Sequence, residues 1–197
     1  MGSTMIEGID YGPLACLVGT WTGDKGMDIS PEPDGQADSP YFETVVFEPV
    51  GDVTNAESQR LVALRYHLVV SRHSDRKPFH SQTGYWMWEP ASGAVTQSLA
   101  IPRAVCVLAG GKATQEGSAT VLEVKASLNG KWGIVQSPFM LEKARTVGFT
   151  HKMTVTGDSL VYAETTFLEI YGRSFDHTDQ NTLRRATNPR LPPARDS

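Results

Sequence analysis

The hydrophobic and polar residues of this chain alternate over short segments. Residues 40–50 (PYFETVVFEPV) and 120–127 (TVLEVKAS) alternate in this way, with a period of two that is typical of β-strands with one buried face. Longer runs of β-branched and aromatic residues, which also favour strands, occur at 60–72 and 79–88. Further segments of the same kind are residues 20–27, 93–101, 103–108, 145–155, 160–170 and 182–184. The pattern therefore predicts about ten short strands.

Turn-forming residues separate these segments at regular intervals. Thr156-Gly157-Asp158-Ser159 is a strong hairpin signal. Other expected turns are Gly51-Asp52, Ser74-Asp75, Ser92-Gly93, Gly110-Gly111 and Asn129-Gly130. Short connections favour an antiparallel up-and-down topology, and closure of the sheet would remove its two exposed edges. We therefore predict an all-β fold, a closed antiparallel up-and-down β-barrel of about ten strands that can hold one small ligand.

Two segments depart from the strand pattern. Residues 12–18 (GPLACLV) are too short for a stable free helix, and we expect a short N-terminal helical turn that plugs one barrel end with Leu14 and Leu17. Residues 23–39 are rich in Gly, Pro and Asp, which favours a loop or a distorted strand. The predicted barrel domain spans residues 12–187, with an N-terminal extension over 1–11 and a flexible tail over 188–197.

Composition narrows the class of protein. Of the 197 residues, 40% are hydrophobic and 20% are charged, as in an ordinary globular domain. The net charge is −4 and no block of Lys and Arg occurs, so we expect no nucleic-acid partner. No apolar run is long enough to span a membrane, and the polar start of the chain shows no export signal, which favours a cytoplasmic location. A homodimer remains open.

The two cysteines fit that location. Cys16 and Cys106 both lie among apolar residues, and we expect free thiols that pack as small core hydrophobes. A disulfide between them is the alternative. No C-x-x-C-H motif occurs, so covalently attached haem is not indicated.

The candidate chemistry of the chain lies mainly in its histidines. Neither a G-x-S-x-G elbow nor a phosphate-binding glycine loop is present, so hydrolase activity and nucleotide binding receive little support. His151 alternates with Phe149 and Met153 and can point inward, whereas His73 adjoins a turn and should be exposed. Acidic and amide residues surround His177, but their spacing matches no established metal loop. The five histidines are His67, His73, His80, His151 and His177.

Four short blocks follow one another along residues 12–185. They are G-T-W-T-G-D at 19–24, P-F-H-S-Q-T-G-Y-W at 78–86, L-A-I-P at 99–102, and F-D-H at 175–177 followed by Leu183 and Arg184-Arg185. In content and order these blocks resemble the nitrobindin family of haem-binding β-barrels. The third block has Ile101 where the family has His, and the fourth has Asp-His-Thr where the family has Pro-His-Leu.

The resemblance implies a ten-stranded barrel, similar to fatty-acid-binding proteins and lipocalins, with a ferric haem b at its mouth. By position, His177 would be the iron ligand and His80 would lie on the other side of the haem. A carboxylate near His177, Asp176 or Asp179, would hydrogen-bond its second ring nitrogen and make it more basic. The pocket lining implied by the resemblance is Thr20, Trp21, Phe79 and Ile101.

The resemblance also implies a function. The family is associated with NO binding and with isomerising peroxynitrite to nitrate, so a peroxynitrite isomerase is the enzymatic hypothesis, with no catalytic residue assigned. The alternative is an intracellular carrier of a fatty acid or another small apolar ligand without haem. Such a carrier needs an inward Arg for the carboxylate. Candidates are Arg65, which competes with the adjacent Tyr66 for the inward position, Arg103 and Arg145. Insertions at 50–60 and 130–143 would lengthen loops that could cover the mouth.

Overall fold

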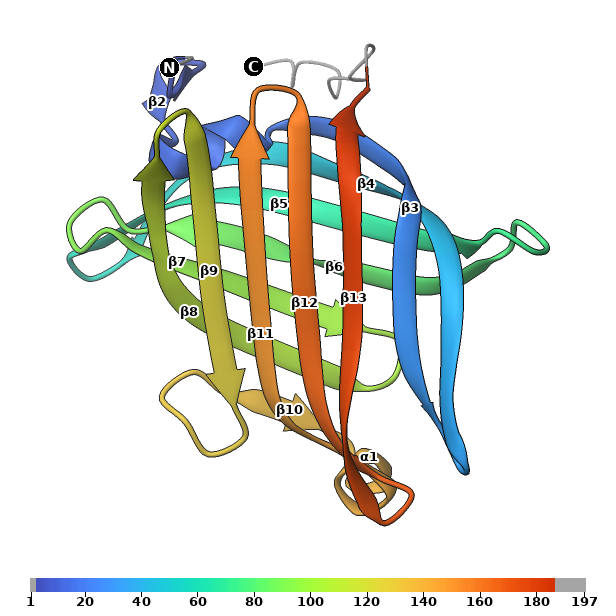
Figure 1. Cartoon of the computed structure of the whole chain (residues 1–197). Coiled ribbons are helices and arrows are strands. Elements are labelled where there is room, and N and C mark those ends of the chain that lie inside the picture. Colours follow the sequence, from blue (N-terminus) through green and yellow to red (C-terminus); the bar gives the residue numbers. More distant parts are fainter. Residues whose placement is uncertain (1–2, 187–197) are drawn as a thin grey trace.

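A computed structural model describes residues 3–186 and confirms the predicted barrel (Figure 1). Within these residues, ten antiparallel strands form a closed sheet in which each strand pairs with the next one along the chain. The strands are β3 (Gly19–Glu32), β4 (Gly35–Ala56), β5 (Gln59–Arg72), β6 (Pro78–Trp88), β7 (Ala94–Ile101), β8 (Val105–Glu116), β9 (Ala119–Ser127), β11 (Ala144–Thr156), β12 (Ser159–Ile170) and β13 (Arg173–Arg185). The ring closes where β13, the last strand, pairs with β3.

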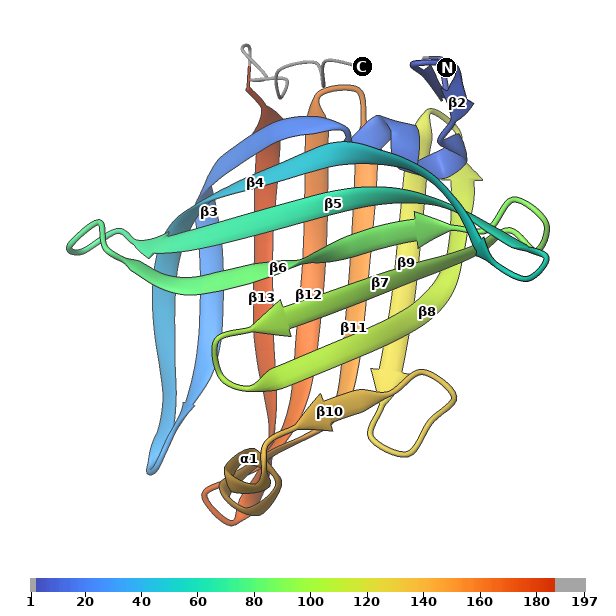
Figure 2. The same cartoon turned by 180° about the vertical axis from the view of Figure 1, so that it is seen from behind.

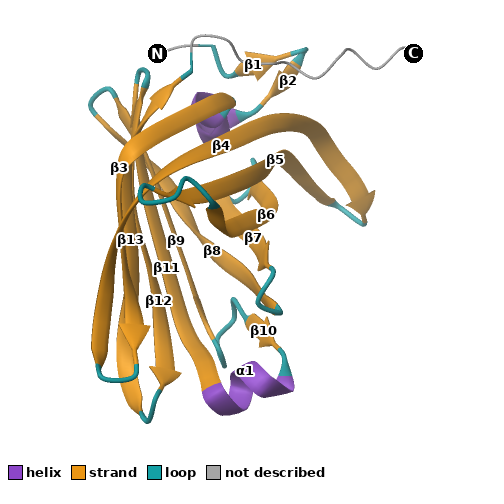
Figure 3. Cartoon of the chain, turned by 90° about the vertical axis from the view of Figure 1, so that its right-hand side faces the viewer, coloured by secondary structure: helices purple, strands orange, loops and turns teal. Residues whose placement is uncertain are grey.

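The two ends of the barrel differ. The 3-10 helix η1 (Gly12–Leu17) lies across one end, and its Leu14 and Leu17 are fully buried, as predicted (Figures 1 and 2). A small hairpin of β1 (Met5–Ile6) and β2 (Ile9–Asp10) precedes it. The short strand β10 (Ile134–Gln136) and the helix α1 (Pro138–Lys143) lie at the opposite end (Figure 3). Neither η1 nor α1 has the length and apolar character of a membrane-crossing helix.

Glycines inside strands account for two wrong turn predictions and for one distorted strand. Residues 23–39 take the distorted-strand alternative: they belong to β3 and β4, which a turn at 33–34 joins, and the pairing is irregular between Gly23 and Gly26. A Cβ atom at Gly26 would overlap the ring of Tyr41, so glycine is what allows this ring to pack there. Gly110-Gly111 lies inside β8, and Gly51 lies at a bulge in β4.

Two other expectations are partly corrected. Both cysteines are free, but Cys106 is exposed on the outer face of β8, between the buried Val105 and Val107. Cys16 is only half-buried. The insertion at 130–143 folds into β10 and α1, whose Met140 and Lys143 line the cavity described below. The insertion at 50–60 instead extends the β4–β5 hairpin and supplies no cavity residue.

Candidate functional site

The barrel encloses a cavity of about 680 Å³. This volume lies in the range of small-molecule sites in proteins. Exposed side chains at the α1 end, Arg103, Phe139 and Tyr171, contribute to its rim. Apolar side chains form much of the wall; they include Val45, Phe47, Leu68, Val70, Leu99, Val105, Val107, Phe149, Met153, Leu160 and Leu168.

Four of the six site residues expected from the sequence line this cavity. They are Phe79, His80, Ile101 and His177. Trp21 is fully buried at the η1 end instead, where its Nε1 donates a hydrogen bond to the carbonyl oxygen of Leu17 over 2.7 Å. Thr20, its neighbour in β3, is also absent from the cavity lining.

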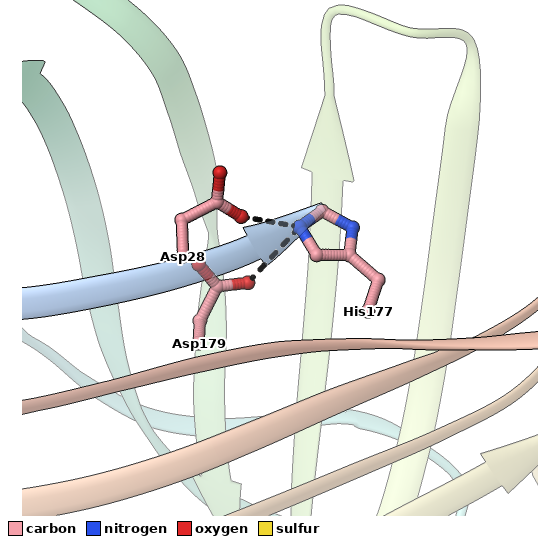
Figure 4. Close-up of side chains that lie close together, drawn as sticks. All are labelled: Asp28, His177 and Asp179. Carbon is pink, nitrogen blue, oxygen red and sulfur yellow. Dashed lines mark hydrogen bonds and ion pairs between the residues drawn. The ribbon is translucent and has the colours of Figure 1, made fainter. Parts of the chain in front are cut away.

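His177 is held by two carboxylates (Figure 4). Its Nε2 lies 2.6 Å from Oδ1 of Asp28 on β3 and 3.6 Å from Oδ2 of Asp179, two residues further along β13. Because a carboxylate accepts hydrogen bonds, Nε2 carries a proton and donates it to Asp28. The sequence suggested Asp176 or Asp179 for this role. Asp176 is exposed, whereas the principal partner, Asp28, comes from the opposite end of the chain.

These contacts control the charge of the cluster. Burial alone lowers the pKa of His177, but the hydrogen bond to Asp28 and the negative charges of Asp179 and Asp28 outweigh it, so the pKa is raised. Burial raises the pKa of Asp179 to about 6, although the charge of His177 opposes this effect. Burial lowers the pKa of His80, which therefore remains neutral near pH 7.

A row of titratable residues crosses four neighbouring strands on the inner face. Asp28 on β3 pairs with Asp179 on β13, Asp179 pairs with Glu164 on β12, and Glu164 pairs with His151 on β11. Like charges directly opposite each other are unfavourable. Burial, followed by the charges of Asp179 and Glu43, raises the pKa of Glu164 well above its ordinary value.

Glu43 forms a second polar group on the cavity wall. Its Oε1 accepts hydrogen bonds from the Tyr162 hydroxyl over 2.8 Å and from Nδ2 of Asn181 over 2.7 Å. The Tyr41 hydroxyl lies 2.6 Å from that of Tyr162. Burial raises the pKa of Glu43 to about 7, the two hydrogen bonds oppose this, and the charge of Asp179 adds to it.

His151 faces the cavity, the orientation that its alternation with Phe149 and Met153 in the sequence allowed. Its Nδ1 lies 3.0 Å from Oε1 of Gln97, whose Nε2 donates to the Tyr66 hydroxyl over 3.1 Å. Gln82 donates to the same hydroxyl over 2.7 Å. Burial lowers the pKa of His151 to about 3, so its ring is neutral. This network identifies Tyr66 as the inward member of the Arg65-Tyr66 pair.

Two of the three arginines predicted for a fatty-acid carrier lie outside the cavity, and the third, Arg103, lies at its exposed rim. Arg65 pairs with Glu48 on the outer face, and Arg145 pairs with the exposed Glu169. Among the cavity-lining residues that the structure describes, the Lys and Arg side chains are Arg103 and Lys143, both exposed. The inner part of the cavity therefore has no arginine to bind a carboxylate.

The fold and the cavity together define a closed β-barrel with an internal site for a small molecule. The model of the family described as "THAP4-like, heme-binding beta-barrel domain" matches residues 10–185, and the chain belongs to this family. Among solved structures, the chain is similar to Rv2717c from M. tuberculosis, with 25% sequence identity and a TM-score of 0.67 over 88% of this chain and 94% of that chain. No curated protein matches the chain. The resemblance to nitrobindin-like barrels is thereby confirmed.

The residues around the cavity fit a haem. The space is of suitable size and largely apolar, and three imidazoles, those of His80, His151 and His177, line it. In the neutral ring of His177 the proton lies on Nε2 and is donated in a hydrogen bond to Asp28, which leaves Nδ1 as the nitrogen with a free lone pair. Arg103 and Lys143 supply positive charge for the two carboxylates of a haem.

Proposed function

We propose that this barrel binds one haem b non-covalently, with His177 as the iron ligand and His80 on the other side of the haem. The observation that carries the proposal is the presence of both histidines in the lining of one cavity, in a chain that belongs to a haem-binding family. The absence of a C-x-x-C-H motif from the sequence favours a b-type haem. Bound haem would supply an iron centre able to bind a small ligand such as NO.

The surrounding residues have separate roles in this proposal. The carboxylate of Asp28 fixes the tautomer and the orientation of the His177 ring and makes it a stronger donor, which favours ferric iron. Neutral His80 can exchange a hydrogen bond with a ligand on the other side. Phe79 and Ile101 provide apolar wall and limit the access of water.

The charge of the cavity limits what the site would act on. The inner part of the cavity contains Asp28, Glu164 and Asp179 but no lysine or arginine, so it provides no such partner for peroxynitrite or a fatty acid, which are both anions near neutral pH. We therefore confine the proposal to haem binding and do not extend it to peroxynitrite isomerisation or to fatty-acid transport. A stopped-flow assay of peroxynitrite decay and nitrate yield, with haem-loaded and haem-free protein, decides on the isomerase activity directly.

The proposal is tested by titrating the purified protein with ferric haem and recording the Soret band. We expect a saturable change with one haem per chain, and a pyridine haemochrome spectrum of the b type. His73→Ala, a substitution of an exposed histidine, is the matched control and should leave the titration unchanged. A Soret change that only grows in proportion to added haem would refute the proposal.

A further inference from the structure

Two buried polar atoms in the cavity lack a hydrogen-bond partner. Among the side chains that the structure describes, the buried polar atoms without a hydrogen bond are Oε2 of Glu43 and Nε2 of His151. Both residues line the cavity, and their exposed fractions are 2% and 8%. Buried polar groups in native proteins are nearly always paired, so these two atoms indicate a missing partner.

The protonation of His151 follows from its neighbours. The Tyr66 hydroxyl accepts the hydrogen bond of the Gln97 amide nitrogen, so the amide oxygen of Gln97 faces His151. Nδ1 of His151 therefore carries the proton and donates it to Gln97. Nε2 of the same ring is left with a lone pair and is an acceptor, as is Oε2 of Glu43 when this carboxyl is ionised.

Tyr162 places the two acceptors in one region of the barrel. Its hydroxyl donates to Oε1 of Glu43, and its ring centroid lies 5.6 Å from that of His151. Glu164 lies directly opposite His151 in the strand register, with an oxygen 3.4 Å from Nδ1. Two carboxyl groups and a neutral imidazole therefore gather around this tyrosine.

This region has no positive side chain of its own. The lysine and arginine among the described cavity-lining residues are Lys143 and Arg103, which are exposed. The histidine with raised pKa, His177, is already paired with Asp28 and Asp179. A bound cation would favour the ionised form of Glu43, and its N–H groups would satisfy both Oε2 of Glu43 and Nε2 of His151.

We propose that the inner part of the cavity, formed by Glu43, His151 and Glu164, binds an organic cation. The ligand would carry a primary ammonium or amidinium group, whose N–H donors reach Glu43 and His151, on an apolar body that contacts the aliphatic wall. A quaternary ammonium lacks these donors. The inference uses residues of the same cavity other than the proposed haem ligands, and its test in haem-free protein does not depend on haem binding.

The test compares four ligands with the same alkyl chain and different head groups by isothermal titration calorimetry. The probes are n-octylamine, n-octanol, octanoate and octyltrimethylammonium, and haem-free and haem-loaded protein are both titrated. We expect octylamine to bind at least roughly tenfold more tightly than octanol and the quaternary ammonium, since only octylamine can donate a charge-assisted hydrogen bond. Octanoate should bind most weakly, because its charge faces carboxylates.

Glu43→Gln keeps the shape and the Oε1 acceptor but removes the charge, and it should reduce octylamine affinity to that of octanol. Glu164→Gln, a second neutral variant, should act in the same direction. Glu123→Gln on the outer face of β9 is the matched control and should bind octylamine like the unmodified protein. Circular dichroism checks that each variant is folded.

Several results would overturn the proposal. Equal affinity for all four head groups would mean that the cavity does not distinguish ligands by the charge of their head group. Tighter binding of octanoate would reverse the inferred ligand class. Stoichiometric binding of Zn²⁺ that Glu43→Gln abolishes, without octylamine binding, would assign the acceptors to a metal ion instead.

Discussion

Nε2 of His177 lies 2.6 Å from Oδ1 of Asp28, a residue 149 positions earlier in the chain. The contact exists because the last strand of the barrel pairs with the first, which places Asp179 opposite Asp28. The orientation of the proposed iron ligand therefore depends on closure of the barrel. Folding and cofactor binding should be coupled, because the site is complete only in the closed form.

Asp28→Asn should weaken haem binding by roughly 10- to 100-fold, the usual effect of removing a carboxylate behind a metal-bound histidine. The amide has no charge, and it cannot raise the basicity of the imidazole as a carboxylate does. Affinity is measured from the Soret band during haem titration. Asp176→Asn is the control, since Asp176 is exposed next to His177 and should tolerate the change. Equal losses in the two variants would remove Asp28 from its assigned role.

Glu43→Gln should change how stability depends on pH. The pKa of Glu43 is raised by burial from 4.5 to about 7, so the native state holds this proton more tightly than the unfolded chain. The unmodified protein therefore loses stability as the pH rises from about 4.5 to about 7, and the glutamine variant lacks this component. At about 1.4 kcal/mol per pKa unit, the variant should gain about 3 kcal/mol relative to the unmodified protein across this window.

Urea unfolding of both proteins between about pH 5 and pH 8 gives the comparison. The difference in the free energy of unfolding should grow with pH. A difference that is constant over this range would show that Glu43 is already ionised in the folded protein near pH 5.

Gly84→Ala should destabilise the barrel by about 3 kcal/mol or more, because overpacking forces the backbone to move. A Cβ atom at Gly84 on β6 would collide with the backbone oxygen of Ser98 on β7. Gly35→Ala is the matched control, since nothing lies within 4 Å of its added Cβ. Denaturant midpoints of the two variants report the difference, and equal midpoints would contradict the packing described between β6 and β7.

The two thiols should differ in reactivity. Cys106 is exposed and should react rapidly with a thiol reagent in the native protein. Cys16 is half-buried, and burial raises its pKa, so it should react slowly until the protein unfolds. Thiol counting without reductant should give two thiols in denaturant. A count of zero would show that a disulfide forms in solution.

Alternation and turn signals were sufficient to predict the barrel, because each strand pairs with its neighbour in the chain. Glycine was the main source of error. At Gly110 and Gly111 it permits close packing inside a strand, whereas a turn uses its conformational freedom, and the sequence does not distinguish the two uses. The cytoplasmic location and the homodimer stay predictions.

The site was predicted less completely. The motifs were sufficient to propose His177 and His80. The position of Asp28 beside His177 depends on the register between the first and last strands, which no local pattern reveals. Glu43 could have been found, since it shares the inward parity of Tyr41 and Val45 in one alternating strand. A charged residue at an inward position of a strand is a sequence signal for a candidate site residue.

Haem titration of His177→Ala beside His80→Ala tests the central claim most directly. If His177 is the iron ligand, its alanine variant should lose the saturable Soret change, whereas His80→Ala should still bind haem with an altered spectrum. Circular dichroism should show an intact barrel in both variants. Retention of haem by His177→Ala together with its loss in His80→Ala would contradict the assignment and transfer the ligand role to His80.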